Sequence, residues 1–367
     1  MAYYYAVAMA VTLLLCYTTT TVYPLSGGAE ARCFRNAKIA FIVLIPLTLV
    51  QVFRWDVGVD SLYEGSYWQA YHAAAEGNNP KEFEFGFYLL MSVFAKLEVP
   101  YFWFLFTLGL TFMTLVSYAF SRGSVWTVWS VLVFFLLAVY FDSYSSLRQS
   151  LAEAISLIGW AYMGYKPPSS KKNVQIIGLF LFAGLFHSIA WMNIPVYLIC
   201  LVRFNRITLL RMIAAAVLLS PVLSALLRIV MTLVAGNKYT YLGVAWINAI
   251  MSGAIAIICW YFYDEISDVD ENAYMYVNQS VGIFILIMNS GAMFLPFRVF
   301  DMLKIGYVFI APYLLRSLRD NKLRSSVCFG VLAVFGAWFV NFFFLQKCFA
   351  ADYQTAFDDW SNIIKLP

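Results

Sequence analysis

The chain has 367 residues, of which 62% are hydrophobic and only 12% are charged, and its formal net charge is +4. Soluble domains contain about 45–50% apolar and about 25% charged residues, so this chain has too little polar surface to cover its apolar content. That excludes a soluble globular or disordered protein. Its apolar runs are also far longer than the roughly ten-residue alternating strands of an outer-membrane barrel. The composition therefore predicts an all-α polytopic membrane protein.

Apolar runs recur along the chain and predict about 12 transmembrane helices. In chain order they lie at about 3–25, 38–53, 101–120, 124–141, 147–165, 173–190, 191–203, 207–234, 244–263, 280–297, 299–315 and 326–346. The first run has neither a preceding basic segment nor a small-residue cleavage site, so we expect a retained span. No internal repeat is visible, and we expect one transmembrane domain over residues 1–367.

Residues 54–100 form the predicted external loop. Basic linkers stay in the cytoplasm, and the four most basic linkers share one side of the membrane only if the short apolar run at 85–97 does not cross. These linkers are 32–38, 166–172, 203–211 and 316–324. We therefore expect a re-entrant or interfacial helix at 85–97. Before it, Tyr63, Tyr67 and Tyr71 recur every four residues. This spacing predicts an amphipathic helix whose aromatic face anchors at the membrane interface or, less commonly, stacks on sugars.

Cationic or titratable residues from five distant segments are expected at one depth, near the outer membrane face. They are Arg54, Arg148, His187, Arg228 with the following Lys238, Tyr239 and Tyr241, and Arg298 with Lys304. A charge in the hydrocarbon is costly unless it is paired or faces a wet cavity, so such residues are functional candidates. Several arginines at one interface suit a lipid-linked diphosphate, because guanidinium binds phosphate oxygens bidentately. Snorkelling to lipid phosphates is the alternative for each arginine.

Two kinds of acid–base candidate and one further carboxylate accompany these cations. Asp56 and Asp60 are either a general base towards a sugar hydroxyl or a structural clasp with Arg54. His187 is either a proton acceptor, since histidine titrates near neutral pH, or a packing residue of the bundle. Glu84 opens the helix predicted at 85–97, where a carboxylate also stabilises the helix dipole.

At these residues the sequence resembles the EpsG family, the Wzy-like polymerases of bacterial exopolysaccharide and capsule assembly. The blocks that carry the resemblance are Arg54, Gly58 and Asp60 with Tyr63 and Tyr67; Glu84 with Phe87; Arg148, Gln149 and Ala152; Phe186, His187, Ser188 and Ala190; and Arg298 with Pro312. Their order and spacing agree over nearly the whole chain. One departure is Phe297, which replaces the glutamate usual before the late arginine.

The resemblance implies a metal-independent glycosyltransferase without a cofactor, located in the bacterial inner membrane with its site facing the periplasm or exterior. It would transfer a growing glycan (O-antigen, capsule or exopolysaccharide) from undecaprenyl diphosphate to the non-reducing end of a new lipid-linked repeat unit. The implied catalytic residues are His187, Asp60, Arg148 and Arg298. The candidate substrate-binding residues are Arg54, Asp56, Tyr63, Tyr67, Glu84, Gln149, Arg228, Lys238, Tyr239, Tyr241 and Lys304.

The expected partners are the undecaprenyl-diphosphate-linked oligosaccharide, the lipid bilayer, a chain-length regulator and a flippase, and no nucleic acid is expected. Two other functions remain open. Another lipid-linked-sugar glycosyltransferase or ligase would use the same donor and make a single addition. A flippase or transporter would be expected to show internal repeats and charges near the bilayer midplane, which are not evident here.

Overall fold

The computed structural model describes residues 29–55, 67–165, 169–235, 246–268, 272–290, 296–340 and 354–355, together with a few single residues before position 29. Its first helices are α2 (Ala29–Val52), α3 (Tyr67–Ala75), α4 (Phe85–Lys96), α5 (Tyr101–Gly123), α6 (Thr127–Leu136), α7 (Val139–Ser145), α8 (Leu147–Tyr165) and α9 (Ser170–Gly184). The 3-10 helix η1 (Ser188–Met192) leads to α10 (Asn193–Cys200), α11 (Arg206–Ala235), α12 (Trp246–Tyr261), α13 (Tyr263–Ser267), α14 (Tyr274–Ser290), α15 (Pro296–Lys304), α16 (Tyr307–Ser317) and α17 (Asn321–Val340).

The predicted all-helical architecture is confirmed within these ranges, where one two-residue strand pair is the exception. Strand β1 (Arg54–Trp55) pairs antiparallel with β2 (Gln354–Thr355), so that Arg54 lies opposite Thr355. This ladder brings the segment after α2 to the C-terminal part of the chain.

The predicted count of about 12 membrane spans is not confirmed. Among the described residues, α5 and α17 are long and apolar enough to cross a membrane, and α6 with α7 makes a third candidate if the bent pair is one span. Most of the predicted span at 3–25 lies outside the described residues. These candidate helices indicate a membrane protein.

Backbone breaks account for part of the difference. The predicted span at 124–141 is bent by 48° between α6 and α7, where Ala138 takes a left-handed conformation with φ 55°. The predicted span at 299–315 is divided into α15 and α16, and the one at 191–203 is divided between η1 and α10. A hydropathy window sums side chains and is insensitive to these local changes of direction.

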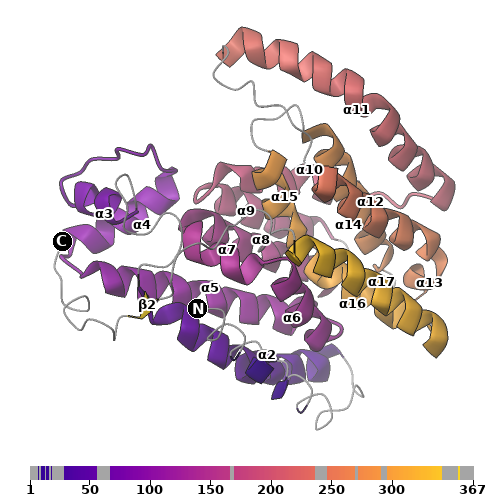
Figure 1. Ribbon diagram of the computed structural model, residues 1–367, viewed down its shortest axis with the longest axis horizontal. Coiled ribbons are helices and arrows are strands. Elements are labelled where there is room, and N and C mark those ends of the chain that lie inside the picture. Colours follow the sequence, from indigo (N-terminus) through magenta and orange to yellow (C-terminus); the bar gives the residue numbers. More distant parts are fainter. Residues whose placement is uncertain are drawn as a thin grey trace.

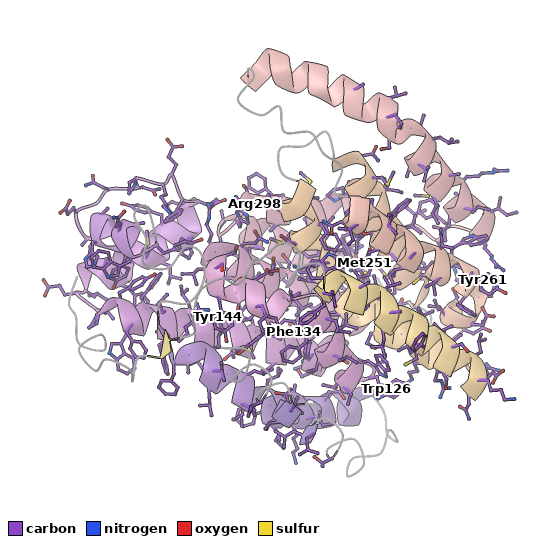
Figure 2. All side chains as sticks on the ribbon, viewed as in Figure 1. Trp126, Phe134, Tyr144, Met251, Tyr261 and Arg298 are labelled. Atoms are coloured by element: carbon purple, nitrogen blue, oxygen red, sulfur yellow. The ribbon has the colours of Figure 1, made fainter. Side chains whose placement is uncertain are left out.

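The main core lies between layers of long helices. Helix α5 packs between α2 and α8, and α14 contacts α10, α11 and α12 (Figure 1). Large buried rings such as Phe120 of α5, Phe134 of α6 and Trp160 of α8 fill part of this main core. Phe134 lies inside the bundle in Figure 2, whereas Arg298 lies at its upper rim in that view.

Helices α3 and α4, which lie in the predicted external loop, pack with residues of α5 and α8 in a second core at one side of the bundle. Helix α4 has 12 residues, about 18 Å of helix, which is shorter than a bilayer core of about 30 Å. The re-entrant or interfacial placement of 85–97 stays a prediction. The predicted amphipathic helix is present as α3, but its aromatic face is turned inward. Tyr67 is 5% and Tyr71 0% exposed, and both pack on rings of the second core.

That finding corrects the expected role of the aromatic face. Tyr67 stacks on Phe83 with ring centroids 5.4 Å apart, and the Tyr71 hydroxyl donates to the Val99 carbonyl at 2.6 Å. Both tyrosines therefore stabilise the α3–α4 pair instead of anchoring it in lipid. Tyr63 lies outside the described residues.

Candidate functional site

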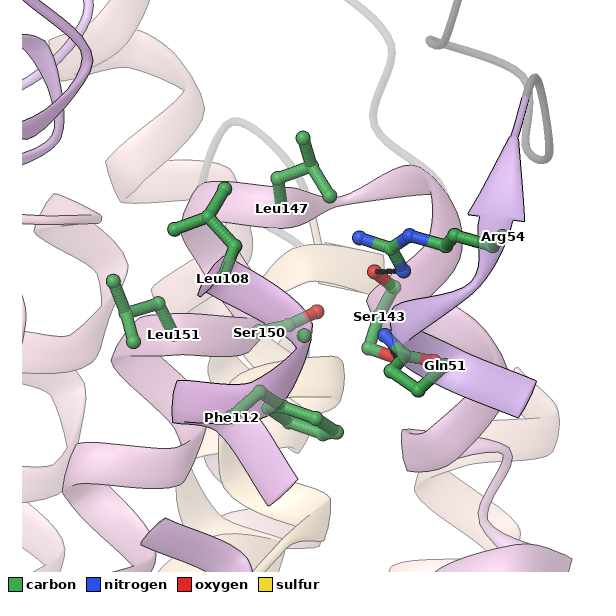
Figure 3. Close-up of a pocket in the computed structure, with 9 residues that line it drawn as sticks. Gln51, Arg54, Leu108, Phe112, Ser143, Leu147, Ser150 and Leu151 are labelled. Atoms are coloured by element: carbon green, nitrogen blue, oxygen red, sulfur yellow. Dashed lines mark hydrogen bonds between the residues drawn. The ribbon is translucent and has the colours of Figure 1, made fainter. Parts of the chain in front are cut away.

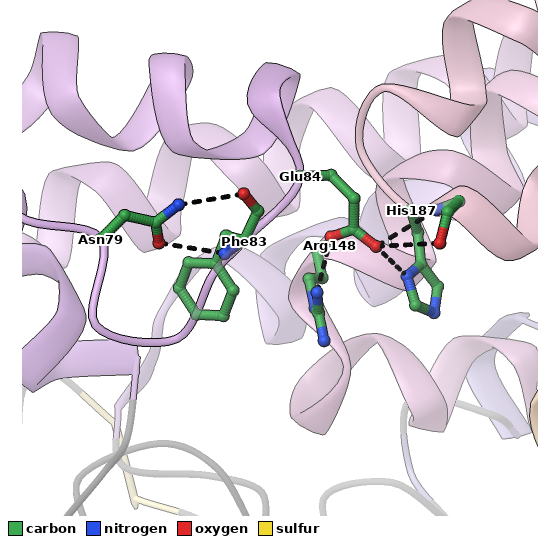
Figure 4. A network of polar contacts seen from close by, with 6 residues as sticks. Asn79, Phe83, Glu84, Arg148 and His187 are labelled. Atoms are coloured by element: carbon green, nitrogen blue, oxygen red, sulfur yellow. Dashed lines mark hydrogen bonds and ion pairs between the residues drawn. The ribbon is translucent and has the colours of Figure 1, made fainter. Parts of the chain in front are cut away.

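Glu84 is presented by a tight loop that one asparagine holds in place. The Asn79 side chain accepts from the Phe83 amide and donates to the Phe83 carbonyl, both at 3.0 Å (Figure 4). Between them, Glu82 takes a left-handed conformation with φ 49°. Glu84 itself is the N-terminal cap residue of α4. The loop thus fixes the point at which the Glu84 side chain leaves the backbone.

The Glu84 carboxylate joins two side chains from distant parts of the chain. Its Oε2 accepts from the Arg148 guanidinium at 2.5 Å, and its Oε1 lies 2.9 Å from Nδ1 of His187 (Figure 4). Oε1 also accepts from the Ser188 amide at 3.2 Å and from the Ser188 hydroxyl at 3.4 Å. Three residues singled out from the sequence for separate reasons therefore meet at one carboxylate. We call Glu84, Arg148 and His187 the Glu84 cluster.

The surroundings keep Glu84 ionised at neutral pH. Burial by itself raises the pKa of this carboxyl group, because it penalises the charged form. The hydrogen bond with His187, the amide of Glu84 itself, the charge of Arg148 and the Ser188 amide together outweigh burial and lower the pKa from 4.5 to about 2. Glu84 therefore acts as a hydrogen-bond acceptor and a fixed negative charge.

An ionised Glu84 determines the tautomer of His187. A carboxylate can only accept hydrogen bonds, so Nδ1 of His187 carries the proton that points to Oε1. In the neutral imidazole the lone pair then lies on Nε2, and no described residue is recorded as a partner of that atom. A carboxylate that orients a histidine in this way leaves the opposite nitrogen ready to take a proton.

The backbone brings α4 and the end of α9 together around the Glu84 cluster. The Gly86 amide donates to the Leu185 carbonyl at 2.8 Å, two residues before His187. A Cβ at position 86 would lie 2.9 Å from that carbonyl oxygen, so the close approach requires glycine. His187 is extended, with φ −155°, and precedes η1.

Arg148 reaches Glu84 from the first turn of α8. Its guanidinium carbon lies 5.1 Å from the centre of the Phe83 ring, and its side chain is 21% exposed. The recorded bond to Glu84 uses one of five guanidinium N–H donors, and the others can serve a further anion. His187, at 5% side-chain exposure, lies deeper than Arg148.

Arg298 lies near the same site without a recorded contact to Glu84. It is exposed at the start of α15, and α15 contacts η1, which follows His187 directly. One turn later, Met302 is fully buried in the second core together with Ala190. Residues four apart share a helix face, so Arg298 lies one turn beyond that contact on the same face of α15.

Arg54 is buried elsewhere, beside the joint between α7 and α8. Its guanidinium donates to the Ser143 carbonyl at 2.7 Å (Figure 3). It also lies 5.1 Å from the Tyr144 ring centre. Gln51 donates to the Ser143 hydroxyl at 2.8 Å, and these residues line a cavity of about 10 Å³, enough for roughly one water molecule. Arg54 thus supports the backbone just before Arg148, and the cavity is too small for a sugar.

Gln149 and Lys304 face the interior. Gln149 donates to Glu153 at 2.8 Å, and Lys304 is 0% exposed and paired with Asp142 and Asp301. The structure therefore does not bring the expected substrate-binding residues Gln149, Lys304 and Tyr67 to an open surface.

The remaining candidates are not placed. Asp56, Asp60, Tyr63, Lys238, Tyr239 and Tyr241 lie outside the described residues, and for Arg228 only its place in α11 is described.

Sequence reasoning did not single out Asp142 or Glu153 as site residues. A signal was available, because ionisable residues at membrane depth are functional candidates. Asp142 follows the predicted span at 124–141, and Glu153 lies inside the predicted span at 147–165. In the described part of the chain, no group of three or more histidine, cysteine or carboxylate side chains is arranged to hold a metal ion.

Comparison with known proteins gives one result. The sequence profile of the EpsG family matches residues 38–355. That range begins within α2, ends in β2 and includes the whole Glu84 cluster and α15. No curated protein and no solved structure matches the chain.

Proposed function

The chain belongs to the EpsG family, which is linked to exopolysaccharide biosynthesis, and we propose that it is the polymerase that joins lipid-linked repeat units. In this proposal the donor is a growing glycan on undecaprenyl diphosphate, and the acceptor is the non-reducing-end hydroxyl of a new lipid-linked unit. The reaction takes place at the outer face of the inner membrane of a bacterium.

The observation that carries the proposal is the meeting of Glu84, Arg148 and His187. Glycosyl transfer from a diphosphate needs a base for the attacking hydroxyl and positive charge for the leaving group. The Glu84 cluster supplies an imidazole whose Nε2 is the basic nitrogen and, on the other side of the same carboxylate, a guanidinium. Membership of a family linked to exopolysaccharide biosynthesis supports a diphosphate-linked sugar as the substrate class in this proposal.

In the proposed reaction one bond forms to the anomeric carbon and one bond to it breaks. The acceptor oxygen forms a bond to the anomeric carbon of the donor sugar, and its proton passes to Nε2 of His187. The bond between the anomeric carbon and the diphosphate oxygen breaks, and its electron pair leaves with undecaprenyl diphosphate. Arg148 and Arg298 stabilise the charge that develops on the leaving diphosphate.

In this proposal Glu84 orients His187, which differs from the substrate contact that the sequence predicts. Its hydrogen bond to Nδ1 holds the imidazole in the basic tautomer and stabilises the imidazolium that forms on proton transfer. Since Glu84 also neutralises part of the Arg148 charge, a second cation is needed for the diphosphate. The exposed Arg298 on the neighbouring α15 is our candidate for that cation.

The test is incubation of the purified protein with its undecaprenyl-diphosphate-linked repeat unit, followed by sizing of the products. We expect a ladder of polymers from the parent and from Glu76→Gln, a control on an exposed glutamate next to α3. His187→Gln should remove the ladder. A single addition in place of a ladder would indicate the alternative ligase, and no transfer by the folded parent would overturn the proposed function.

A further inference from the structure

Lys304, at the end of α15, lies at the centre of a buried group of charges. Its ammonium group is 0% exposed and donates to Asp301 on its own helix at 2.9 Å and to Asp142 on α7. It also lies 4.7 Å from the centre of the Trp338 ring on α17. Glu153 on α8, 1% exposed, is close enough to interact with it electrostatically. One ammonium therefore connects α15 with α7, α8 and α17.

A short helix such as α15 depends on these connections. It has nine residues, and isolated helices of fewer than about 12–15 residues are marginal in water, so tertiary contacts must hold it in place. These contacts include the ion pair of Lys304 with Asp142 at its C-terminal end and Met302 in the second core two residues earlier. Val299, Phe300 and Leu303 also pack in the main core. At its start lies Arg298, exposed and beside η1.

We propose that Asp142 is a positioning residue for Arg298, acting through Lys304. The Asp142–Lys304 ion pair fixes α15 against α7, and thereby sets the place of Arg298 relative to the Glu84 cluster. This inference rests on the proposed function, in which Arg298 binds the leaving diphosphate.

The physical argument is that a buried ion pair between two helices restricts both. An ammonium without exposure to water must keep its carboxylate partners, because leaving a buried charge unpaired is costly. Helix α15 cannot move away from α7 without separating Lys304 from Asp142. Since a displacement of about 1 Å at a catalytic group can cost roughly a hundredfold in rate, a restraint on the position of α15 should affect the reaction.

The two carboxylates on Lys304 offer a matched comparison. Asp142→Asn removes the charge that joins α15 to α7, whereas Asp301→Asn removes a charge within α15 itself. Each variant removes one negative charge from the same ammonium and leaves it the other carboxylate. A general loss of stability from altered charge should therefore affect both variants, and a loss of helix position should affect Asp142→Asn alone.

The experiment measures binding of undecaprenyl diphosphate, in detergent micelles, to the purified full-length protein and its variants. Asp142→Asn should weaken binding roughly tenfold, within the range for a misplaced catalytic group, and Asp301→Asn less than about twofold. In an Arg298→Gln background the further effect of Asp142→Asn should disappear, since residues that act through one another are not additive. Amide hydrogen exchange without ligand should be faster within α15 in Asp142→Asn than in Asp301→Asn.

The outcomes separate the inference from the proposed function. If Arg298→Gln weakens binding but Asp142→Asn matches Asp301→Asn, or adds fully to Arg298→Gln, the positioning role is overturned and the proposed function stands. If neither Arg298→Gln nor Arg148→Gln weakens binding, the proposed diphosphate site is wrong. Equal α15 hydrogen exchange in the two aspartate variants would overturn the restraint whatever the binding results.

Discussion

Replacing Glu84 by glutamine tests the Glu84 cluster through its pH dependence. The surroundings lower the pKa of Glu84 from 4.5 to about 2, a shift of about 2.5 pH units. At about 1.36 kcal/mol per unit this corresponds to about 3 kcal/mol of stability. The side chain is 18% exposed, and partial screening by solvent reduces the figure to about 2–3 kcal/mol. Glu84→Gln should lose this amount at neutral pH.

The sign of the effect follows from the lowered pKa. A carboxyl group with a lower pKa in the folded state stabilises the protein fully above its unfolded pKa, here 4.5, and the stabilisation disappears as the pH falls towards about 2. The difference between parent and Glu84→Gln should therefore be constant above about pH 5 and fall to less than half by about pH 3.

The assay is chemical or thermal unfolding of the purified protein in detergent at several pH values, with Glu76→Gln as the matched control. Glu76 is exposed, and its substitution should leave stability within about 0.5 kcal/mol of the parent at every pH. A difference between parent and Glu84→Gln that stays the same from pH 7 to about pH 3 would refute the reasoning. It would show that packing, and not the charge of Glu84, accounts for the loss.

The sequence identified the members of the Glu84 cluster but not its arrangement. In the sequence, Arg148 and His187 are ionisable groups at the ends of predicted spans, and Glu84 is a carboxylate at a helix start. They lie 64 and 103 residues from Glu84, and one sequence without an alignment contains no signal for contacts at such separations. For that reason the sequence predicts Glu84 only as a substrate contact and a carboxylate at a helix start, whereas the structure places it 2.9 Å from Nδ1 of His187.

Burial was the second quantity that the sequence did not provide. The sequence groups Lys304 with Arg298 because both follow a predicted span, yet Lys304 is 0% exposed and Arg298 is exposed. The two residues are on one helix, and the difference arises because Asp142 in α7, one turn after the bend, pairs with Lys304. A continuous helix over the predicted span at 124–141 would lack the bend that precedes Asp142. The same bend explains part of the discrepancy in the number of spans.

Three further predictions address the proposed chemistry. Arg148→Lys and Arg298→Lys keep the charge but lose the planar guanidinium, so each should reduce polymerisation strongly while the protein accumulates normally in the membrane. If both variants polymerise like the parent, the two arginines are lipid anchors and not diphosphate ligands. His187→Gln should bind the lipid-linked donor yet lose turnover by roughly a hundredfold or more, and retained turnover would rule out this base. Gly86→Ala should push α4 away from the Leu185 carbonyl, because its Cβ would lie 2.9 Å from that oxygen. We expect a cost of about 1–3 kcal/mol in unfolding experiments, together with reduced polymerisation. Gly178→Ala in α9 is the matched control, because nothing lies within 4 Å of its added Cβ. If both alanine variants behave alike, the close approach of α4 and α9 does not position Glu84.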